Sequence, residues 1–108
     1  MTNARSNSLE SIHHIGVQVS DIDAALAWYR ERFAFEAVYV DASWALLQFE
    51  NVALALVLPG QHPAHFAVAR DDAETHGELT PHRDGTASVY ICDPWDNVIE
   101  IMKPATGD

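Results

Sequence analysis

Three short segments of this chain alternate between apolar residues and polar or small ones, with a period of two. They are His14–Val19, His65–Ala69 and Val98–Met102. Because successive side chains of a β-strand point to opposite faces, this period predicts three strands, each with an apolar core face and an open face. His14, His65 and Glu100 fall on the open faces. A curved sheet could therefore gather two imidazoles and one carboxylate on one surface.

Two imidazoles and one carboxylate suit a divalent transition metal and leave coordination positions open to water, substrate or dioxygen. We therefore predict a metal site at His14, His65 and Glu100. Simpler explanations stand beside this one, because a strand histidine is more often hydrogen-bonded than metal-bound and a strand glutamate can protect a sheet edge. In a regular strand, His13 would face away from His14, so the two could not bind the same ion.

The length of the chain predicts its number of domains, and its net charge excludes some classes of partner. A chain of 108 residues is expected to form one domain with a single core. The net charge of −10, with only six Lys and Arg, argues against nucleic acid and acidic membranes as partners. No apolar run approaches the ~20 residues that cross a bilayer, and the N-terminus does not resemble a signal peptide. With one cysteine, Cys92, we expect a cytoplasmic protein.

The apolar pattern divides the chain into a flexible tail, residues 1–10, and one domain, residues 11–104. Module one covers about residues 11–59 and is expected to contain a strand, an amphipathic helix and three further strands. The helix is predicted to start from an N-cap at Ser20 and to run to about Arg32. The three further strands are expected at residues 36–41, 44–49 and 52–58.

Module two, about residues 62–103, begins with the His65 strand. Its acidic segment from Asp71 to Glu74 is typical of a helix start, but a glycine and a proline soon after it leave room for only a turn or two. A hairpin is then predicted at residues 86–92 and 98–102. The order of elements in module two therefore echoes that of module one.

Both ends of the domain resemble the vicinal oxygen chelate superfamily. The segment from His13 to Asp21, HHIGVQVSD, is similar to that superfamily's opening strand and helix cap, and Val89 to Ile101 is similar to its terminal hairpin with a ligating glutamate. The resemblance implies an α+β, glyoxalase-like fold, in which two βαβββ modules form a curved, cup-shaped mixed sheet with helices on the outer face. It also implies the ligands His14, His65 and Glu100.

Members of this superfamily include glyoxalase I, methylmalonyl-CoA epimerase, extradiol dioxygenases, fosfomycin-resistance transferases and bleomycin-binding proteins, so the resemblance alone does not select a reaction. Glyoxalase I and the epimerase use a fourth protein ligand, and matching the two modules places Ala55 there, which cannot ligate. The remaining ligands, two histidines and one glutamate, are similar to those of the dioxygenases and fosfomycin transferases. It implies Fe(II) or Mn(II), with Zn(II) or Ni(II) as alternatives. We expect a dioxygenase-like or lyase/transferase-like metalloenzyme that binds a small molecule through its oxygen atoms.

Further residues are candidates for the substrate site. The expected pocket residues are Gln18, Gln48, Ser88 and Trp44. Gln48 is also a candidate for the missing fourth ligand if it faces inward. Tyr90 and His82 are candidate catalytic residues, because ring-cleaving members add a tyrosine and a histidine base. Tyr90 is equally explained as a half-buried strand aromatic, and His82 as a solvated loop residue.

Two expectations concern assembly and an alternative function. Chains of this superfamily often pair, and a short helix in module two would leave apolar surface uncovered, so we expect a homodimer. The alternative function is a metal-free protein that binds a drug or metabolite in the same cup, as bleomycin-resistance proteins do. Bleomycin-binding members lack the ligand residues. Because this chain has all three, we consider this alternative second to the metalloenzyme.

Overall fold

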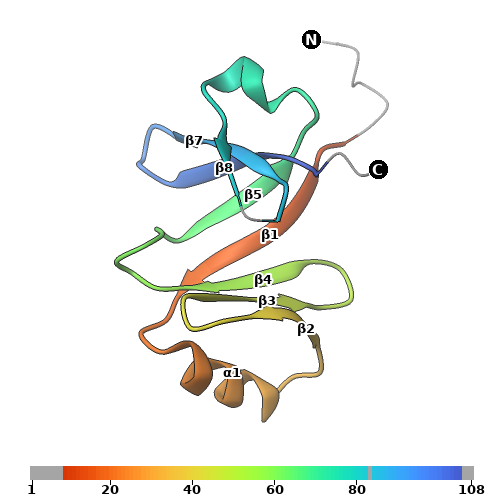
Figure 1. The fold of residues 1–108 in the computed structure, drawn as a ribbon, viewed down its shortest axis with the longest axis vertical. Helices are drawn as coiled ribbons and strands as arrows, with labels where there is room; N and C mark the ends of the chain where they lie inside the picture. The colour runs from red at the N-terminus through yellow and green to blue at the C-terminus, as the bar shows by residue number, and fades with distance from the viewer. Residues whose placement is uncertain (1–8, 83, 106–108) are drawn as a thin grey trace.

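The computed structural model describes residues 9–82 and 84–105 of the chain, so most of the predicted tail lies outside the described residues. Eight strands form one mixed sheet in the order β2-β3-β4-β1-β5-β8-β7-β6, which curls as a half-barrel (Figure 1). The strands are β1 (Ser11–Gln18), β2 (Glu36–Val40), β3 (Trp44–Gln48), β4 (Ala53–Val57), β5 (His65–Ala69), β6 (Thr80–Pro81), β7 (Ala87–Cys92) and β8 (Val98–Lys103).

Strand pairing repeats in the two halves, which confirms the cup-shaped α+β fold. In each half the first strand pairs in parallel with the last, β1 with β4 and β5 with β8. The halves join through the antiparallel pair of β1 and β5 at the centre of the sheet. The two-residue β6 was not predicted. It contains Pro81, which has no N–H to donate and so fits only at the sheet edge that β6 forms.

The single α-helix, α1 (Ile22–Arg30), starts one residue later than predicted and ends earlier. Its N-cap is Asp21 rather than Ser20, because the Asp21 carboxylate accepts a hydrogen bond from the Ala24 amide at 3.0 Å. The predicted N-cap at Ser20 was therefore wrong, and the helix ends shortly before the predicted end near Arg32. None of the helices in the described residues is long and apolar enough to cross a membrane.

The main core lies between α1 and the outer face of module one. Ile22 and Leu26 of the helix pack against Ala45, Leu47 and Leu56 of the sheet, and each of these five residues is at most 8% exposed. Burial of these side chains removes apolar surface from water and fixes the helix on the sheet. The opposite face of the sheet, which forms the inside of the cup, remains available for a site.

Module two has only a single 3₁₀ turn, η1 (Ala73–His76), where module one has a helix. This short turn agrees with the expected turn or two, and Ala73 is fully buried where the turn contacts β7 and β8. On the same outer face, Ile12 and Ile15 of β1 remain 50% and 40% exposed. The outer apolar face is therefore only partly covered.

Candidate metal centre

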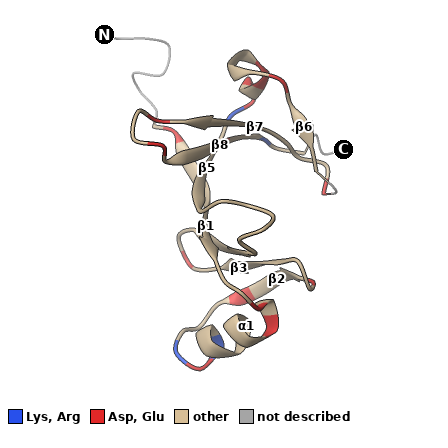
Figure 2. Cartoon of the chain, turned by 90° about the vertical axis from the view of Figure 1, so that its left-hand side faces the viewer, with Lys and Arg blue, Asp and Glu red and all other residues tan. Residues whose placement is uncertain are grey.

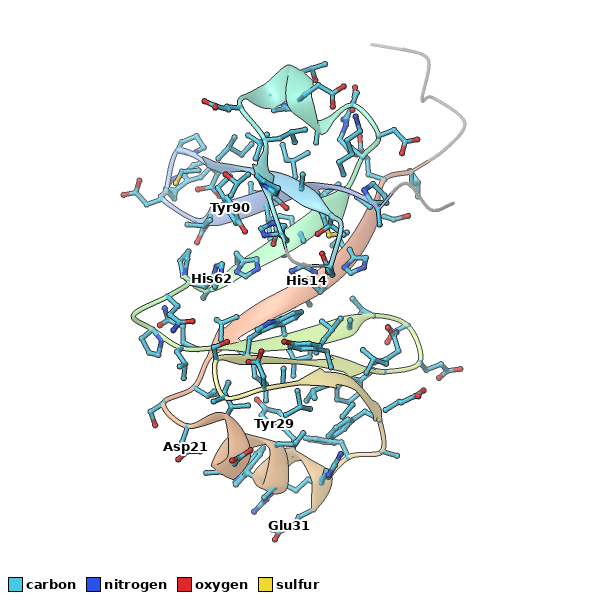
Figure 3. The ribbon with its side chains drawn as sticks, in the orientation of Figure 1. His14, Asp21, Tyr29, Glu31, His62 and Tyr90 are labelled. Carbon is cyan, nitrogen blue, oxygen red and sulfur yellow. The ribbon has the colours of Figure 1, made fainter. Side chains whose placement is uncertain are left out.

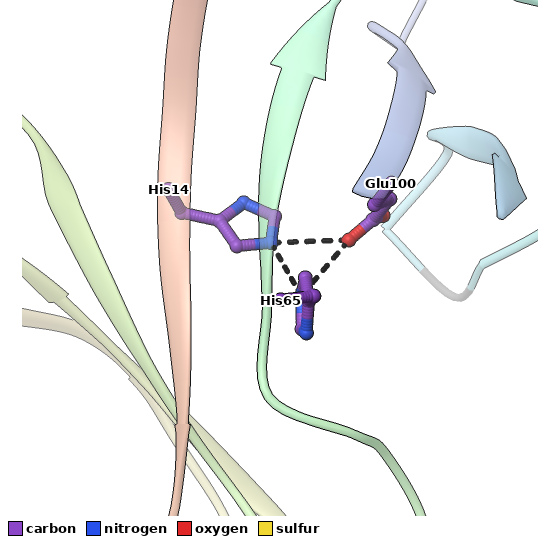
Figure 4. Close-up of side chains that lie close together, drawn as sticks. All are labelled: His14, His65 and Glu100. Atoms are coloured by element: carbon purple, nitrogen blue, oxygen red, sulfur yellow. Dashed lines mark hydrogen bonds and ion pairs between the residues drawn. The ribbon is translucent and has the colours of Figure 1, made fainter. Parts of the chain in front are cut away.

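Three adjacent strands bring the predicted ligands together (Figure 4). His14 lies on β1, His65 at the start of β5 and Glu100 in the middle of β8. Ala67 of β5 pairs with His14 on one side and with Glu100 on the other, so these three residues form one row across the sheet. The small side chain of Ala67 leaves the space above the row to the two ligands.

The donor atoms form a compact triangle. His14 Nε2 lies 3.3 Å from His65 Nε2 and 3.1 Å from Glu100 Oε1, and His65 Nε2 lies 3.2 Å from the same oxygen. All three residues are buried. Because metal bonds to nitrogen and carboxylate oxygen measure about 2.0–2.2 Å, one ion could reach all three atoms at these separations. The residues present therefore fit a divalent transition metal.

A backbone carbonyl fixes the orientation of the His65 ring. His65 Nδ1 donates a hydrogen bond to the Pro63 oxygen at 2.8 Å. A carbonyl can only accept, so the proton lies on Nδ1 and the neutral ring has its lone pair on Nε2, the atom that faces the other ligands. Metal-binding histidines in general carry such a partner on the second nitrogen.

A hydroxyl group holds the far oxygen of Glu100. The fully buried Ser88 donates a hydrogen bond to Glu100 Oε2 at 2.5 Å, and His82 Nε2 lies 2.9 Å from the same hydroxyl. Since the single hydroxyl proton goes to the carboxylate, His82 Nε2 is the donor to Ser88. Oε2 is thus anchored, and Oε1 is free to face the imidazoles.

The expectation that His13 faces away from His14 is wrong. β1 has an irregularity between Ile12 and His14, where Ile12 pairs with Val68 but His14 already pairs with Ala67. The extra residue in the strand is His13, and its Nδ1 lies 2.8 Å from His14 Nδ1. A β-bulge re-aims side chains in this way, and the alternation rule assumes a regular strand.

Hydrogen bonding controls the charges of the ligand cluster. Burial opposes ionisation of Glu100, but the hydrogen bonds with His14, His65 and Ser88 outweigh it and hold the pKa of the carboxyl well below its ordinary value. The hydrogen bond with Glu100 raises the pKa of His65 above its ordinary 6.5, against the opposing effect of burial. A bound metal requires a neutral imidazole, so metal binding must displace this proton.

A cavity of about 310 Å³ opens beside the three ligands. Five of the six histidines in the chain line it, namely His13, His14, His62, His65 and His82. Figure 3 labels His14 and His62 together with Tyr90, and their side chains gather in the middle of the molecule. Among the described residues, no Lys or Arg lines this cavity.

The predicted catalytic residues both reach this cavity. Tyr90 pairs with Glu100 across β7 and β8, and both Tyr90 and His82 belong to the cavity lining. Burial, together with the charge of Glu100, raises the pKa of Tyr90 to about 12, so the phenol is protonated at neutral pH. The His62 ring was not singled out in the sequence, because it lies in a loop without a periodic pattern.

Of the four predicted pocket residues, only Trp44 belongs to the cavity lining. Trp44 lines the cavity, with its ring stacked on Tyr39 at 4.5 Å between centroids, whereas Ser88 lies beneath Glu100. Neither Gln18 nor Gln48 is part of the lining. Each sits at a strand end, where its side-chain amide donates to a backbone carbonyl: Gln18 to His62 at 2.9 Å and Gln48 to Phe49 at 2.8 Å.

The position expected for a fourth ligand is on the cavity wall. Ala55 of β4 pairs with Gly16 of β1, next to the ligand row, and it lines the cavity. An alanine side chain has no donor atom for a metal. Gln48, the suggested replacement, has its amide on the Phe49 carbonyl and lies outside the lining. The described residues therefore provide three ligands and an open side.

Solved structures with the same fold include methylmalonyl-CoA epimerase in complex with methylmalonyl-CoA and NH4+. That structure has a TM-score of 0.74 and 19% identity, with 92% of this chain and 97% of that chain covered. A Streptomyces coelicolor methylmalonyl-CoA epimerase variant in complex with 2-nitronate-propionyl-CoA gives the same four values. A hypothetical protein from Bacillus halodurans C-125 has a TM-score of 0.71 and 14% identity, with 94% and 99% covered. At these identities the likeness shows a shared fold only.

No curated protein matches the chain by sequence. The chain does match the family described as Glyoxalase/Bleomycin resistance protein/Dioxygenase superfamily, over residues 11–101. This match covers most of the chain and agrees with the two βαβββ halves and with the resemblance noted in the sequence. The protein is therefore a member of the glyoxalase/bleomycin resistance protein/dioxygenase superfamily.

Proposed function

We propose that this protein is a metal-dependent enzyme that binds a small molecule through its oxygen atoms at an ion held by His14, His65 and Glu100. The triangle of donor atoms carries this proposal, because each edge measures 3.1–3.3 Å and the triangle borders a cavity of about 310 Å³. A structural metal site is normally closed by a fourth protein ligand, whereas a catalytic site keeps a position open. Three ligands beside a cavity favour catalysis.

The donor set guides the choice of metal and of reaction. Two imidazoles and one carboxylate with open positions are typical of Fe(II) oxygenases, and Mn(II) also accepts such ligands. We propose Fe(II) or Mn(II) as the resident ion, with Zn(II) or Ni(II) as alternatives. When bound, the ion would supply Lewis-acid polarisation of a substrate oxygen and, for iron, access to dioxygen chemistry. The reaction is then dioxygenase-like or lyase/transferase-like.

Two cavity side chains can assist the substrate in different ways. The protonated Tyr90 phenol can donate a hydrogen bond to an oxygen that gains negative charge. Burial and the neighbouring His65 lower the pKa of His62, so its imidazole is neutral at pH 7 and can accept a proton. His82, the catalytic histidine suggested by the sequence, also lines the cavity, but its Nε2 donates a hydrogen bond to Ser88.

The charges of the described residues favour a substrate without a large anionic group (Figure 2). The neighbouring epimerase structures contain CoA esters, whose phosphates would need nearby cations. The described Lys and Arg lie elsewhere: Arg30 and Arg32 at the end of α1, Arg70 against Glu10 and Asp72, and Lys103 against Glu74. We propose a compact substrate that is held by the ion and by the aromatic and histidine side chains of the cavity.

Metal analysis of protein purified without chelators tests the proposal. We expect about one ion per chain in the wild type, and its loss in His65→Ala and Glu100→Gln, because each change removes one of three ligands. His76→Ala is the matched control, since His76 is the one histidine outside the cavity lining. A trace metal content that is unchanged in all four proteins would overturn the proposal.

One observation favours the second candidate, a metal-free binding protein. The three ligand residues already contact one another, and no buried side-chain nitrogen or oxygen in the described part of the chain lacks a hydrogen-bond partner. The cluster can therefore exist without an ion. In that case His65→Ala would leave the affinity for a small molecule in the cavity unchanged, which equilibrium binding can measure.

We also propose that two copies of the chain pair through the outer face of module two. In the described part of the chain, that face carries only the short η1 turn, and Ile12 and Ile15 of the adjoining strand β1 are about half exposed on the same side of the sheet. Sedimentation should show a dimer at micromolar concentration, and Ile15→Asp should dissociate it. A wild-type protein that sediments as a monomer at this concentration would contradict the proposal.

A further inference from the structure

We infer that His13 is a positioning residue for the metal centre: it accepts a hydrogen bond from His14 Nδ1 and so keeps His14 Nε2 free for ligation. This inference rests on the proposed function, because it concerns a ligand of the proposed ion. No motif in the sequence marks His13 for this role. Its contact with His14 exists only because the strand is irregular at this point.

The irregularity of β1 lies beside the ligand. Ile12 pairs with Val68 and His14 with Ala67, so β1 inserts one residue, His13, between two successive pairs. A bulge gives up local pairing in the sheet, and bulges are common next to active sites, where they redirect a side chain. Here the redirected imidazole lines the cavity rather than the outer face.

The direction of the hydrogen bond follows from ligation. His14 Nδ1 and His13 Nδ1 are 2.8 Å apart, and the two rings meet edge to face with 5.1 Å between centroids. If His14 binds an ion through Nε2, its only proton is on Nδ1, and Nδ1 must act as the donor. His13 Nδ1 is then the acceptor, and the proton of its neutral ring lies on Nε2.

His13 does not fit the role of a further ligand. It contacts the nitrogen of His14 that is opposite to the ligating one, and the cluster of donor atoms within 4.8 Å of one another contains only His14, His65 and Glu100. Its ring therefore supports the site from behind. A metal ligand commonly has such a supporting partner, whose loss weakens metal affinity about 10–100-fold.

Each ligand then has one identified support from a different part of the chain. His65 donates to the Pro63 carbonyl and Glu100 accepts from the Ser88 hydroxyl. His13 gives His14 the equivalent support. Without it, His14 Nδ1 would lose the hydrogen-bond partner that the structure describes for it, and the ring could rotate or place its proton on Nε2, where it would block the metal.

Zinc titration against a chromophoric chelator tests this role. We expect His13→Ala to weaken Zn(II) binding about 10–100-fold. His13→Asn should remain within about 3-fold of wild type, because asparagine Oδ1 occupies a position similar to histidine Nδ1 and accepts a hydrogen bond. His76→Ala, which removes an exposed histidine outside the cavity, should bind as wild type.

Nitrogen-15 NMR of the Zn(II)-loaded proteins gives a second readout that a merely structural role would not change. We expect a slowly exchanging His14 Nδ1–H signal in wild type and in His13→Asn. In His13→Ala, measured at saturating zinc, the same proton should exchange rapidly with water. Circular dichroism of the three proteins will show whether the fold is retained.

The outcomes separate the two proposals. If the wild type binds no Zn(II), Fe(II) or Mn(II), the proposed function and this inference both fail. If wild type and His13→Ala bind zinc equally, with the same His14 Nδ1–H exchange, while Glu100→Gln does not bind, the inference alone fails. If His13→Asn is as weak as His13→Ala, an accepting atom at this position is not what supports His14, and the inference is overturned as well.

Discussion

The imidazole of His65 lies directly over the backbone of Gly16. A Cβ added at Gly16 would come 2.4 Å from His65 Cε1 and 2.6 Å from its Nδ1. The two residues are opposite each other in the antiparallel pair of β1 and β5. Strand β1 therefore needs a residue without a side chain at this point, so that the ligand ring can occupy the space.

We predict that Gly16→Ala displaces the His65 ring and impairs the metal centre. The added methyl group would overlap the imidazole, and such overpacking typically destabilises a fold by about 1–3 kcal/mol. Zn(II) affinity should fall more than about 10-fold. Loss of a supporting partner of a metal ligand already weakens binding about 10–100-fold, and here the ligand ring itself is displaced. Gly60→Ala is the control, because no atom lies within 4 Å of its added Cβ. Equal zinc affinity in both variants would contradict the prediction.

Glu100→Gln should lose the metal and keep the fold. Glutamine has nearly the same shape, and its amide can still hydrogen-bond with Ser88, but it has no negative charge for the ion. We expect the metal affinity to fall more than about 100-fold, beyond the effect of losing a supporting partner. Metal content and circular dichroism together measure this, and a variant with wild-type metal content would exclude Glu100 as a ligand.

The positions of the three ligands could be predicted from the sequence because they lie in alternating segments with apolar neighbours. Phe66 and Val68 of β5, for example, assign His65 to the opposite face. The same rule failed for His13, because a bulge breaks the alternation and no residue type in β1 signals it. Local periodicity thus indicates the face of a residue only where the strand is regular.

Other parts of the site depend on where loops and strand ends go. His62 reaches the cavity from the loop before β5, which has no period to interpret. Gln18 and Gln48 lie at strand ends, and their amides bind backbone carbonyls instead of facing the cavity. Alternation alone could not show this, because it gives the face of a side chain and not its distance from the ligands along the strand.

Neighbouring leucines of β3 should affect different properties. Leu47 is fully buried in the core against α1, whereas Leu46 lines the cavity. Leu47→Ala should lower the free energy of unfolding by about 2–5 kcal/mol, because it leaves a void in the core. Leu46→Ala should destabilise less and instead change the affinity for ligands in the cavity. Urea denaturation and ligand titration of both variants distinguish the two effects.

The stability of the metal-free protein should depend on pH through His65 and Glu100. The pKa of Glu100 is lowered from 4.5, so its contribution to folding is present above pH 4.5 and is lost as the pH falls towards the folded value. The pKa of His65 is raised from 6.5, so its contribution is complete below pH 6.5 and is lost as the pH rises through the raised value. The pair should therefore stabilise the metal-free fold most between these two ordinary values.

Metal binding should show the opposite trend above this range, because the ion competes with the proton on His65. We predict that the increase in melting temperature caused by Zn(II) grows from about pH 6 to about pH 8. Burial lowers the pKa values of His13 and His62, which also favours the folded state at higher pH, so wild type must be compared with Glu100→Gln. The stability difference between these two metal-free proteins should narrow as the pH rises from about 6 to 8. A difference that stays constant over this range would show that His65 and Glu100 do not form the ion pair.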